Sequence, residues 1–508
     1  MRAVPCLSQI KTALMQSFRS VLAILMSNGS DKLSTFAALQ NPVFRRLWIA
    51  SLISGTCVAA HDTAAVWVMN TLSSSALSLS LMSTVASLPL FLFTLPAGVL
   101  ADLVDRRKLL GCVNLWLAFA AGLLAILGSL RLLSPNVLLF CVFMIGLGFA
   151  FNAPAWSAFV SDVIAVEELP SAATLGGLQL NVSGIIGPTL GGVLLYLFGA
   201  NWVFVVNASC FVGVILTLLP WTRVEAVAQL PLENFFASLS TAIHYVRCAP
   251  AIRVVLARNV LFAFFISVIP ALIPVVGLKE LHLRPCSLGL LFTSMGVGSA
   301  FSAVFVLPRL RRRLSPNVST ILANLLEAMV YLLMAFVRQP LIFMIVAALA
   351  GLGWTVAASE LWVAGQRVIP CWARGRMNAI VIMVSQGGIA LGGMIWGLAS
   401  QAAGVNTTLI VAAVTFTISL SLGIPLSINF TTSLDSQASP QRRRGRASVQ
   451  ESRSYRSSEG GNQKTGVGVR LMVRALGGRM ANGERRTVNG ERGKFTTEAQ
   501  RAQRSQRI

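Results

Sequence analysis

The chain alternates between long apolar runs and short polar interruptions from residue 47 to residue 428. A membrane-spanning helix needs about 20 mostly apolar residues. Twelve of the runs reach that length, and the pattern predicts a helix in each one. They cover residues 47–70, 79–101, 109–131, 135–160, 173–198, 201–220, 257–278, 286–308, 318–337, 340–363, 377–402 and 405–428. We therefore expect an all-α membrane protein with twelve transmembrane helices.

The two halves of this apolar region repeat each other. The fifth predicted helix holds Gly-Pro-Thr-Leu-Gly-Gly at residues 187–192, and the eleventh holds Gly-Ile-Ala-Leu-Gly-Gly at residues 388–393. Similar sets of six helices form two bundles related by a pseudo-twofold axis, with the binding site between them. We expect an N-terminal six-helix bundle at 43–220, a central cytoplasmic loop at 221–256 and a C-terminal six-helix bundle at 257–428.

Small residues in these two segments predict close helix packing, because they let neighbouring backbones approach each other. The expected helix-packing motif consists of Gly187, Pro188, Gly191, Gly192, Gly388, Gly392 and Gly393.

Composition and charge predict the orientation in the membrane. The chain is 55% hydrophobic and 12% charged, whereas soluble proteins carry roughly 25% charged residues. The net charge is nevertheless +23, and nearly all Lys and Arg residues lie at the two ends of the chain or in the loops after even-numbered helices, such as 106–108 and 309–313. Cytoplasmic loops carry an excess of Lys and Arg. We therefore expect a multi-pass protein of the cell inner (plasma) membrane with both termini in the cytoplasm.

The two ends of the chain differ from the apolar region. Residues 429–508 are rich in Arg, Gly, Ser and Gln, which predicts a disordered basic cytoplasmic tail held near anionic lipid headgroups. We expect no nucleic-acid partner, because aromatic residues do not accompany the basic ones. Residues 1–42 lack the features of a signal peptide and are expected to be a cytoplasmic segment, with Met26 as an alternative start to Met1.

No pattern typical of an enzyme occurs in the sequence. It contains no P-loop, nucleophile elbow, HExxH segment or dinucleotide fingerprint. The eight cysteines form no CxxC pair and the three histidines are scattered, so we expect packing roles and no metal site. We expect neither enzymatic activity nor a cofactor. Without a P-loop for ATP, an ion gradient is the expected driving force for any transport.

Ionisable residues inside predicted helices are the strongest functional candidates. A charge at the bilayer centre costs at least about 2.5 kcal/mol on insertion scales, so it usually faces the bundle interior or a water-filled cavity. Three acids qualify, namely Asp62, Glu327 and Glu360. Burial favours the neutral form of a carboxyl group, so such a group can take up and release protons near neutral pH. The alternative for each acid is a structural hydrogen bond to a neighbouring helix.

Two neutral polar residues complete the set of proton-coupling and substrate-cavity candidates. His61 is adjacent to Asp62, but successive residues on a helix point about 100° apart, which favours a packed neutral histidine over a proton relay. Asn152 lies two residues before Pro154. It either contacts substrate or seals the helix turn that the proline opens, and the structural role is favoured.

The segment PAGVLADLVDRRK at residues 96–108 predicts a cytoplasmic gating loop between the second and third helices. Asp102 can accept hydrogen bonds from a neighbouring helix end and pair with Arg106 or Arg107. A charge pair that forms only when the cytoplasmic side is closed would favour one of two conformers. The expected gating residues are Gly98, Asp102, Asp105, Arg106, Arg107 and Lys108.

The same segment resembles the loop signature of the major facilitator superfamily. The surrounding chain is similar to the bacterial exporter branch of that superfamily, the group that includes the enterobactin exporter. Further matching segments are FRRLW (44–48), DTAAVW (62–67), FNAPAW (151–156), IGPTLGG (186–192), RGRMN (374–378) and QGGIALGG (386–393). The resemblance implies the major facilitator fold, a monomer, and alternating access. It further implies proton-coupled export of a small molecule such as a siderophore or drug.

Two other functions stay open at this point. The chain could be an importer or uniporter of a small solute, without proton-coupled export. It could also be a non-transporting membrane scaffold or sensor that acts through its basic tail.

Overall fold

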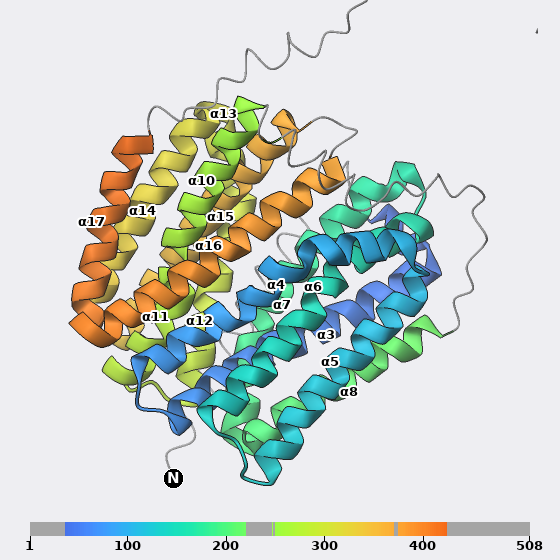
Figure 1. The fold of residues 1–508 in the computed structure, drawn as a ribbon, viewed down its shortest axis with the longest axis horizontal. Helices are drawn as coiled ribbons and strands as arrows, with labels where there is room; N and C mark the ends of the chain where they lie inside the picture. The colour runs from blue at the N-terminus through green and yellow to red at the C-terminus, as the bar shows by residue number, and fades with distance from the viewer. Residues whose placement is uncertain (1–35, 220–245, 247–248, 370–373, 424–508) are drawn as a thin grey trace, which may run out of the picture. The chain divides into compact units, whose positions relative to one another are not determined.

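A computed structural model describes residues 36–219, 246, 249–369 and 374–423, and every regular element in this part is helical (Figure 1). The predictions for residues 1–35, for most of the central loop and for the tail lie outside the described residues.

The first half contains six long helices, as the apolar runs predict. Local signals fix where they begin: the side chain of Asn41 accepts hydrogen bonds from the backbone nitrogens of Val43 and Phe44, directly before a proline in the first turn. The elements are η1 (Ala37–Gln40), α3 (Pro42–Leu72), α4 (Ala76–Leu103), α5 (Arg106–Ser129), α6 (Pro135–Val163), η2 (Val166–Glu168), α7 (Leu169–Phe198) and α8 (Ala200–Leu218).

The second half also contains six spans, two of which include a π-helical turn. One span consists of α10 (Pro250–Ile266), α11 (Val268–Val275) and the π-helix η3 (Val276–Glu280). The next consists of α12 (Pro285–Phe301), the π-helix η4 (Ser302–Val306) and α13 (Leu307–Arg313). The others are α14 (Pro316–Phe336), α15 (Pro340–Val368), α16 (Arg374–Ala403) and α17 (Val405–Gly423).

The helix bounds agree with the predicted spans to within several residues. Among the described residues, 11 helices are long and apolar enough to cross a membrane, and the shorter apolar helix Val405–Leu420 corresponds to the twelfth prediction. The largest difference is at α10, which begins at Pro250, inside the stretch predicted as loop. Its first turns are helical because Ile252 and Val255 are buried in an apolar cluster with α15 and α16.

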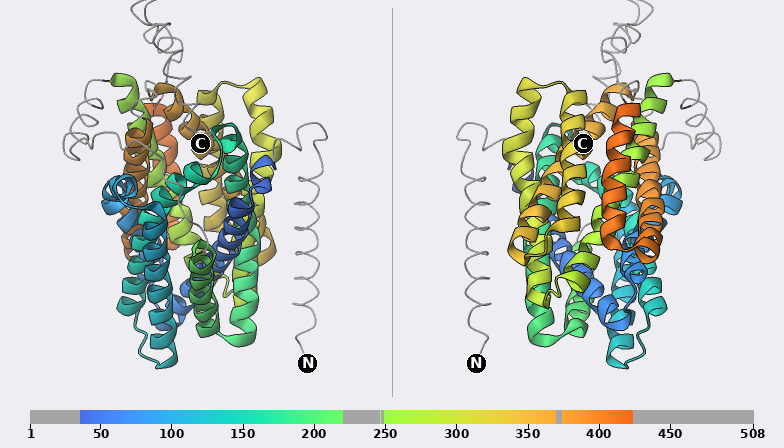
Figure 2. Two further views of the ribbon diagram at one scale, coloured as in Figure 1. Left: turned by 90° about the vertical axis from the view of Figure 1, so that its right-hand side faces the viewer. Right: turned by 90° about the vertical axis from the view of Figure 1, so that its left-hand side faces the viewer.

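The two halves lie next to each other and meet mainly through two helix pairs. Helices α3–α8 form one group and α10–α17 the other, and α4 and α16 lie beside each other where the groups meet (Figure 1). The second extensive pairing joins α7 to α12. The side views show the same packing of both groups (Figure 2). The described part therefore has the two six-helix bundles that the sequence predicts.

The basic side chains gather at one end of the helices, which we call the basic end; the opposite end is the outer end. The basic end holds the start of α3, α5 and α10 and the end of α13 and α15. The outer end holds the α3–α4 connection at residues 73–75 and the residues that follow η3. Basic-end residues include Arg45, Arg46, Arg106, Arg107, Lys108, Arg309, Arg311, Arg312, Arg313 and Arg367.

Polar contacts join the two halves toward the outer end. The hydroxyl oxygens of Thr189 on α7 and Thr293 on α12 are 2.6 Å apart, and Thr293 donates to the backbone oxygen of Ile185 at 2.8 Å. The ammonium group of Lys279 on η3 donates to the backbone oxygens of Ser73 and Ser74 in the α3–α4 connection. These bonds hold the outer end closed.

Toward the basic end, α7 moves away from α12. A Cβ atom at Gly296 of α12 would lie 2.5 Å from the backbone oxygen of Gly184, so the backbones touch there. The same face of α7 continues through Leu180, Gly177 and Ala173, and all three are exposed, Leu180 to 74%. The halves are thus closed at the outer end and diverge along α7 toward the basic end.

Candidate functional site

Asp62 is an accessible carboxylate in the middle of a membrane-length helix. It is exposed, whereas its neighbours His61 and Thr63 are each only 1% exposed. Among the described residues none forms a hydrogen bond or ion pair with the Asp62 carboxylate. An ionisable group in this position usually faces water inside a bundle. Asp62 is therefore free to bind a proton or a cationic or hydrogen-bonding group of a ligand.

His61 points away from this accessible position into the interface of α3 and α8. Its ring packs against Phe204, with ring centroids 4.8 Å apart, and neither ring nitrogen has a hydrogen-bond partner. Asn207, one turn along α8 from Phe204, is 1% exposed, and both of its amide atoms also lack partners. His61 and Asn207 form a buried polar region beside Asp62.

Asn152 lies on α6 and is half-buried. Its neighbour Phe151 packs near Phe93 of α4, with ring centroids 6.3 Å apart. Pro154 lies within the same helix, as the sequence indicates. Asn152 thus lies on the segment of α6 that packs against α4, in the first half of the molecule.

Glu327 is an acid without a partner inside the second half. It lies on α14, is 0% exposed, and neither carboxyl oxygen accepts a hydrogen bond. Gly353 of α15 lies against it: a Cβ atom there would be 2.6 Å from Oε1 of Glu327. A side chain at this position would therefore require the Glu327 carboxyl group to shift.

Glu360 has a different environment on the neighbouring helix α15. Its side chain is 2% exposed and accepts a charged hydrogen bond from Nε of Arg311 on α13, at 2.7 Å. Arg311 is itself 43% exposed at the basic end. The sequence places Glu360 deep in its helix, but the structure ties it to the basic end through this pair.

The described charged residues of the predicted gating loop bond within the first half. Asp105 caps α5 by accepting hydrogen bonds from the backbone nitrogens of Arg107 and Lys108. Arg106 forms its ion pair with Asp162 at the end of α6. The side chain of Asp102 lies outside the described residues.

Two further residues of the gating loop, Gly98 and Arg107, have the following surroundings. Arg107 donates to the backbone oxygen of Leu219. A Cβ atom at Gly98 would meet no described atom within 4 Å. The loop is therefore joined to the end of α6 and the end of α8, within its own half.

The glycine motif of α7 packs tightly against α3. A Cβ atom at Gly187 would lie 2.5 Å from the Cβ of Ala59, and one at Gly191 would lie 2.6 Å from the backbone oxygen of Ala60. Real Cβ atoms do not approach other atoms this closely, so only glycine fits both positions. This contact fixes the segment of α3 directly before Asp62.

The motif of α16 repeats this arrangement in the second half. A Cβ atom at Gly388 would lie 2.8 Å from the Cβ of Ala263, and one at Gly392 would lie 2.4 Å from the backbone oxygen of Phe264. Both contacts are made to α10, the counterpart of α3. The pseudo-symmetry seen in the sequence therefore extends to individual glycine contacts.

The last glycine of each motif faces the opposite half. A Cβ atom at Gly192 would lie 2.7 Å from the backbone oxygen of Pro285 on α12, and one at Gly393 would lie 2.7 Å from Oγ1 of Thr84 on α4. Pro188, inside α7, has its backbone oxygen 2.4 Å from a Cβ built at Gly289. Each motif thus joins its own bundle to the other one.

The predicted polar candidates are divided between the two halves of the molecule. Asp62, His61 and Asn152 belong to the first half, whereas Glu327 and Glu360 belong to the second. In the described part of the chain, no three His, Cys, Asp or Glu side chains are placed to hold a metal ion. The sequence also missed Lys279 and Arg311, whose partners lie 205 and 49 positions away.

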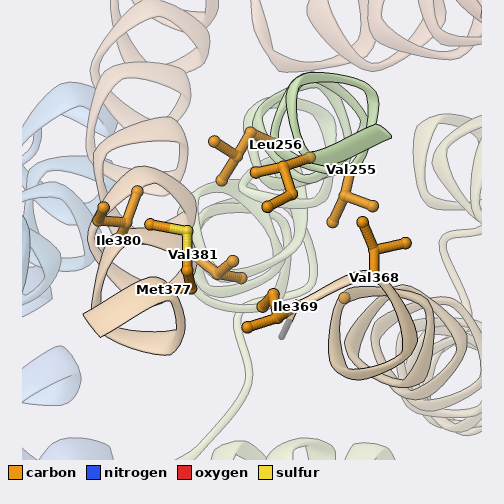
Figure 3. A pocket seen from close by; sticks show the side chains of 9 residues that line it. Val255, Leu256, Val368, Ile369, Met377, Ile380 and Val381 are labelled. Carbon is orange, nitrogen blue, oxygen red and sulfur yellow. The ribbon is translucent and has the colours of Figure 1, made fainter. Parts of the chain in front are cut away.

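An apolar pocket lies apart from these residues, at the basic end of the second half. Its lining side chains converge from three helices and contain only carbon and one methionine sulfur (Figure 3). It offers no polar group to a ligand. The lining residues are Ile252, Val255 and Leu256 of α10, Gly365 and Val368 of α15, Ile369, and Met377, Ile380 and Val381 of α16.

Comparisons with known proteins agree with this architecture. The family model described as "Transmembrane secretion effector" matches residues 33–453. The enterobactin exporter EntS of Citrobacter koseri is 26% identical over 365 residues, which cover 70% of this chain and 85% of that protein. The EntS of Salmonella typhi is 25% identical over the same coverage.

Solved structures show the same fold at low sequence identity. A bacterial homologue of the human lysosomal transporter Spinster, in an inward-facing unoccupied conformation, has a TM-score of 0.61 at 15% identity and covers 81% of this chain and 100% of that one. A bacterial homologue of the iron transporter ferroportin, in an inward-facing state, has a TM-score of 0.58 at 16% identity and covers 75% and 98%.

Proposed function

Because the chain belongs to the transmembrane secretion effector family of the major facilitator superfamily, we propose that it is a secondary exporter. It moves a small organic molecule across the bacterial inner (plasma) membrane in exchange for protons. The observation that carries the proposal is Asp62, an accessible and unpaired carboxylate in the middle of α3. The family is one of membrane transporters and not of enzymes.

The proposed mechanism is alternating access by two halves. The outer end is joined by Lys279 and the Thr189–Thr293 contact, while α7 diverges from α12 toward the basic end. If the basic end faces the cytoplasm, with both termini on that side, this conformation is open to the cytoplasm and can load substrate there. Breaking the outer contacts then exposes the substrate to the other side.

The three acids are proposed to have different roles. Asp62 binds either a proton or the substrate, so that proton uptake from the outside displaces the substrate. Glu360 is engaged by Arg311 at the basic end, which suits a contact that changes as that end opens and closes. Glu327 is enclosed between α14 and α15 and is the second site at which a proton can reside.

A siderophore is the first substrate class to test. The curated relatives are named enterobactin exporters, and at 26% and 25% identity they suggest the class but do not fix the compound. An amphipathic drug is the other proposed class. We propose that a monomer suffices, since each half supplies its own part of the path.

Inside-out membrane vesicles test the proposal, because export then appears as uptake. With an acidic lumen, vesicles containing the wild-type protein should accumulate labelled enterobactin, and a protonophore should abolish this accumulation. Asp62→Asn should lose the gradient-driven uptake, whereas Glu167→Gln, a change at an exposed acid between α6 and α7, should retain it. Full gradient-driven uptake by Asp62→Asn would contradict the role of Asp62.

A further inference from the structure

Two thiols face each other between α3 and α8 in the first half. Sγ of Cys57 lies 3.2 Å from Sγ of Cys210. Both are free thiols and both are half-buried. Cys112, by contrast, is exposed, and Cys141 is buried. The exporter mechanism proposed above uses none of these thiols.

Two buried polar side chains flank the thiol pair. His61 is one turn beyond Cys57 on α3, and Asn207 is one turn before Cys210 on α8; residues with this spacing are neighbours on a helix surface. Each is 1% exposed, and all of their side-chain polar atoms lack hydrogen-bond partners. His61 and Asn207 thus border the thiol pair without bonding to either sulfur.

We propose that Cys57 and Cys210 form a redox-active dithiol site, which hydrogen peroxide converts into a disulfide joining α3 to α8. The reactive form of a cysteine is the thiolate. The two Sγ atoms are 3.2 Å apart, so whichever thiol is oxidised first, the other is placed to attack it.

The reaction has two steps. Written with Cys57 first, its thiolate attacks one peroxide oxygen and the O–O bond breaks, which leaves a sulfenic acid on Cys57 and a hydroxide that takes up the proton released by the thiol and leaves as water. Sγ of Cys210 then attacks Sγ of Cys57, the S–O bond breaks, and a second water leaves with the thiol proton of Cys210. Two thiols and one peroxide thus give one disulfide and two waters.

The disulfide would act within one half of the transporter. Both α3 and α8 belong to the first bundle, so the bond does not cross the boundary between the halves. It would attach the helix that carries Asp62 to its neighbour. A bond between residues far apart in sequence restricts the unfolded chain, so the oxidised protein should be the more thermally stable form.

The test is peptide mapping of the purified full-length protein after exposure to hydrogen peroxide. The wild type should form a Cys57–Cys210 disulfide that dithiothreitol reverses, at least about ten times faster than the isolated Cys112 forms sulfenic acid, because only the pair has a second thiol beside the oxidised sulfur. In Cys210→Ser, dimedone should trap the sulfenic acid on Cys57. In Cys57→Ser, dimedone should trap it on Cys210, and the matched control Cys112→Ser should leave the disulfide unchanged.

Two results would overturn the proposal. One is a wild-type protein in which Cys57 and Cys210 stay reduced at peroxide concentrations that oxidise Cys112. The other is an oxidised wild type that melts at the same temperature as the reduced form. Neither readout depends on transport, so a failed transport assay leaves the test of this site intact.

Discussion

At the residue scale, Glu327 and Glu360 show how neighbouring helices give the same residue type different properties. Glu360 has an ion-pair partner in Arg311, whereas Glu327 has none and packs against the backbone of Gly353. Both acids stand out in the sequence as charges inside apolar runs. Their partners do not, because contacts between helices depend on rotation and tilt that one sequence leaves open.

Removing Arg311 should destabilise the protein through Glu360. Arg311→Gln leaves a buried carboxylate unpaired; since Arg311 is 43% exposed, the cost should fall between about 1 kcal/mol for a surface pair and about 3–5 kcal/mol for a buried one. Thermal melting in detergent measures the loss. The double variant Arg311→Gln/Glu360→Gln should regain part of the stability. Exposed Arg312→Gln is the control, and equal losses from both arginine variants would refute the pair.

Replacing Gly353 by alanine should destabilise the protein for a steric reason. Gly353→Ala places a Cβ atom 2.6 Å from Oε1 of Glu327 and should cost about 1–3 kcal/mol of stability by overpacking. Gly122→Ala on α5 meets no atom within 4 Å and should be neutral or stabilising, because alanine is the better helix former. If the two variants melted at the same temperature, the described contact with Glu327 would be wrong.

At the scale of helices, the apolar pattern predicts the elements well, because the membrane requires a fixed apolar length for each span. The pattern also predicts that the α7 and α16 glycines permit close packing. It does not show that Gly191 and Gly392 face their own half while Gly192 and Gly393 face the other, because that depends on which face each helix turns to its neighbours. It also misses the early start of α10 at Pro250, where tertiary burial extends a helix past its apolar core.

Because Gly191 faces its own half and Gly192 faces the other half, alanine substitutions at these two positions should have different effects. Gly191→Ala should lower the melting temperature, since its Cβ would meet the backbone of Ala60 inside one bundle. Gly192→Ala should instead weaken closure of the outer end, because its Cβ would meet the backbone of Pro285 in the other half. Labelling of a cysteine at Thr189 with a membrane-impermeant maleimide from the outside should increase only for Gly192→Ala. Increased labelling in Gly191→Ala alone would contradict the assignment.

At the scale of the whole molecule, the internal repeat in the sequence predicts the architecture of two halves. It does not predict that the outer end is closed. The outer contacts join residues from different halves, such as Lys279 with Ser74, and lysine near a helix end is more often a surface charge than a bridge. The sequence therefore predicts the fold of the transporter but not the conformation in which its halves rest.

Lys279 should favour the conformation in which the outer end is closed. Lys279→Gln removes the ammonium group that donates to the backbone oxygens of Ser73 and Ser74, so the population open at the outer end should increase. Arg284→Gln, at an exposed charge near the same end, is the matched control. Maleimide labelling from the outside at Thr189→Cys reports the change. Unchanged labelling in Lys279→Gln would show that this bridge does not hold the halves together.

A disulfide across the outer end tests alternating access most directly. Thr189 and Thr293 have hydroxyl oxygens 2.6 Å apart, so Thr189→Cys/Thr293→Cys should form an inter-half disulfide in a Cys57→Ser/Cys210→Ser background. In inside-out vesicles with an acidic lumen, the oxidised variant should lose enterobactin uptake, and dithiothreitol should restore it. Full uptake with the two halves covalently joined would contradict transport through a path that opens at the outer end.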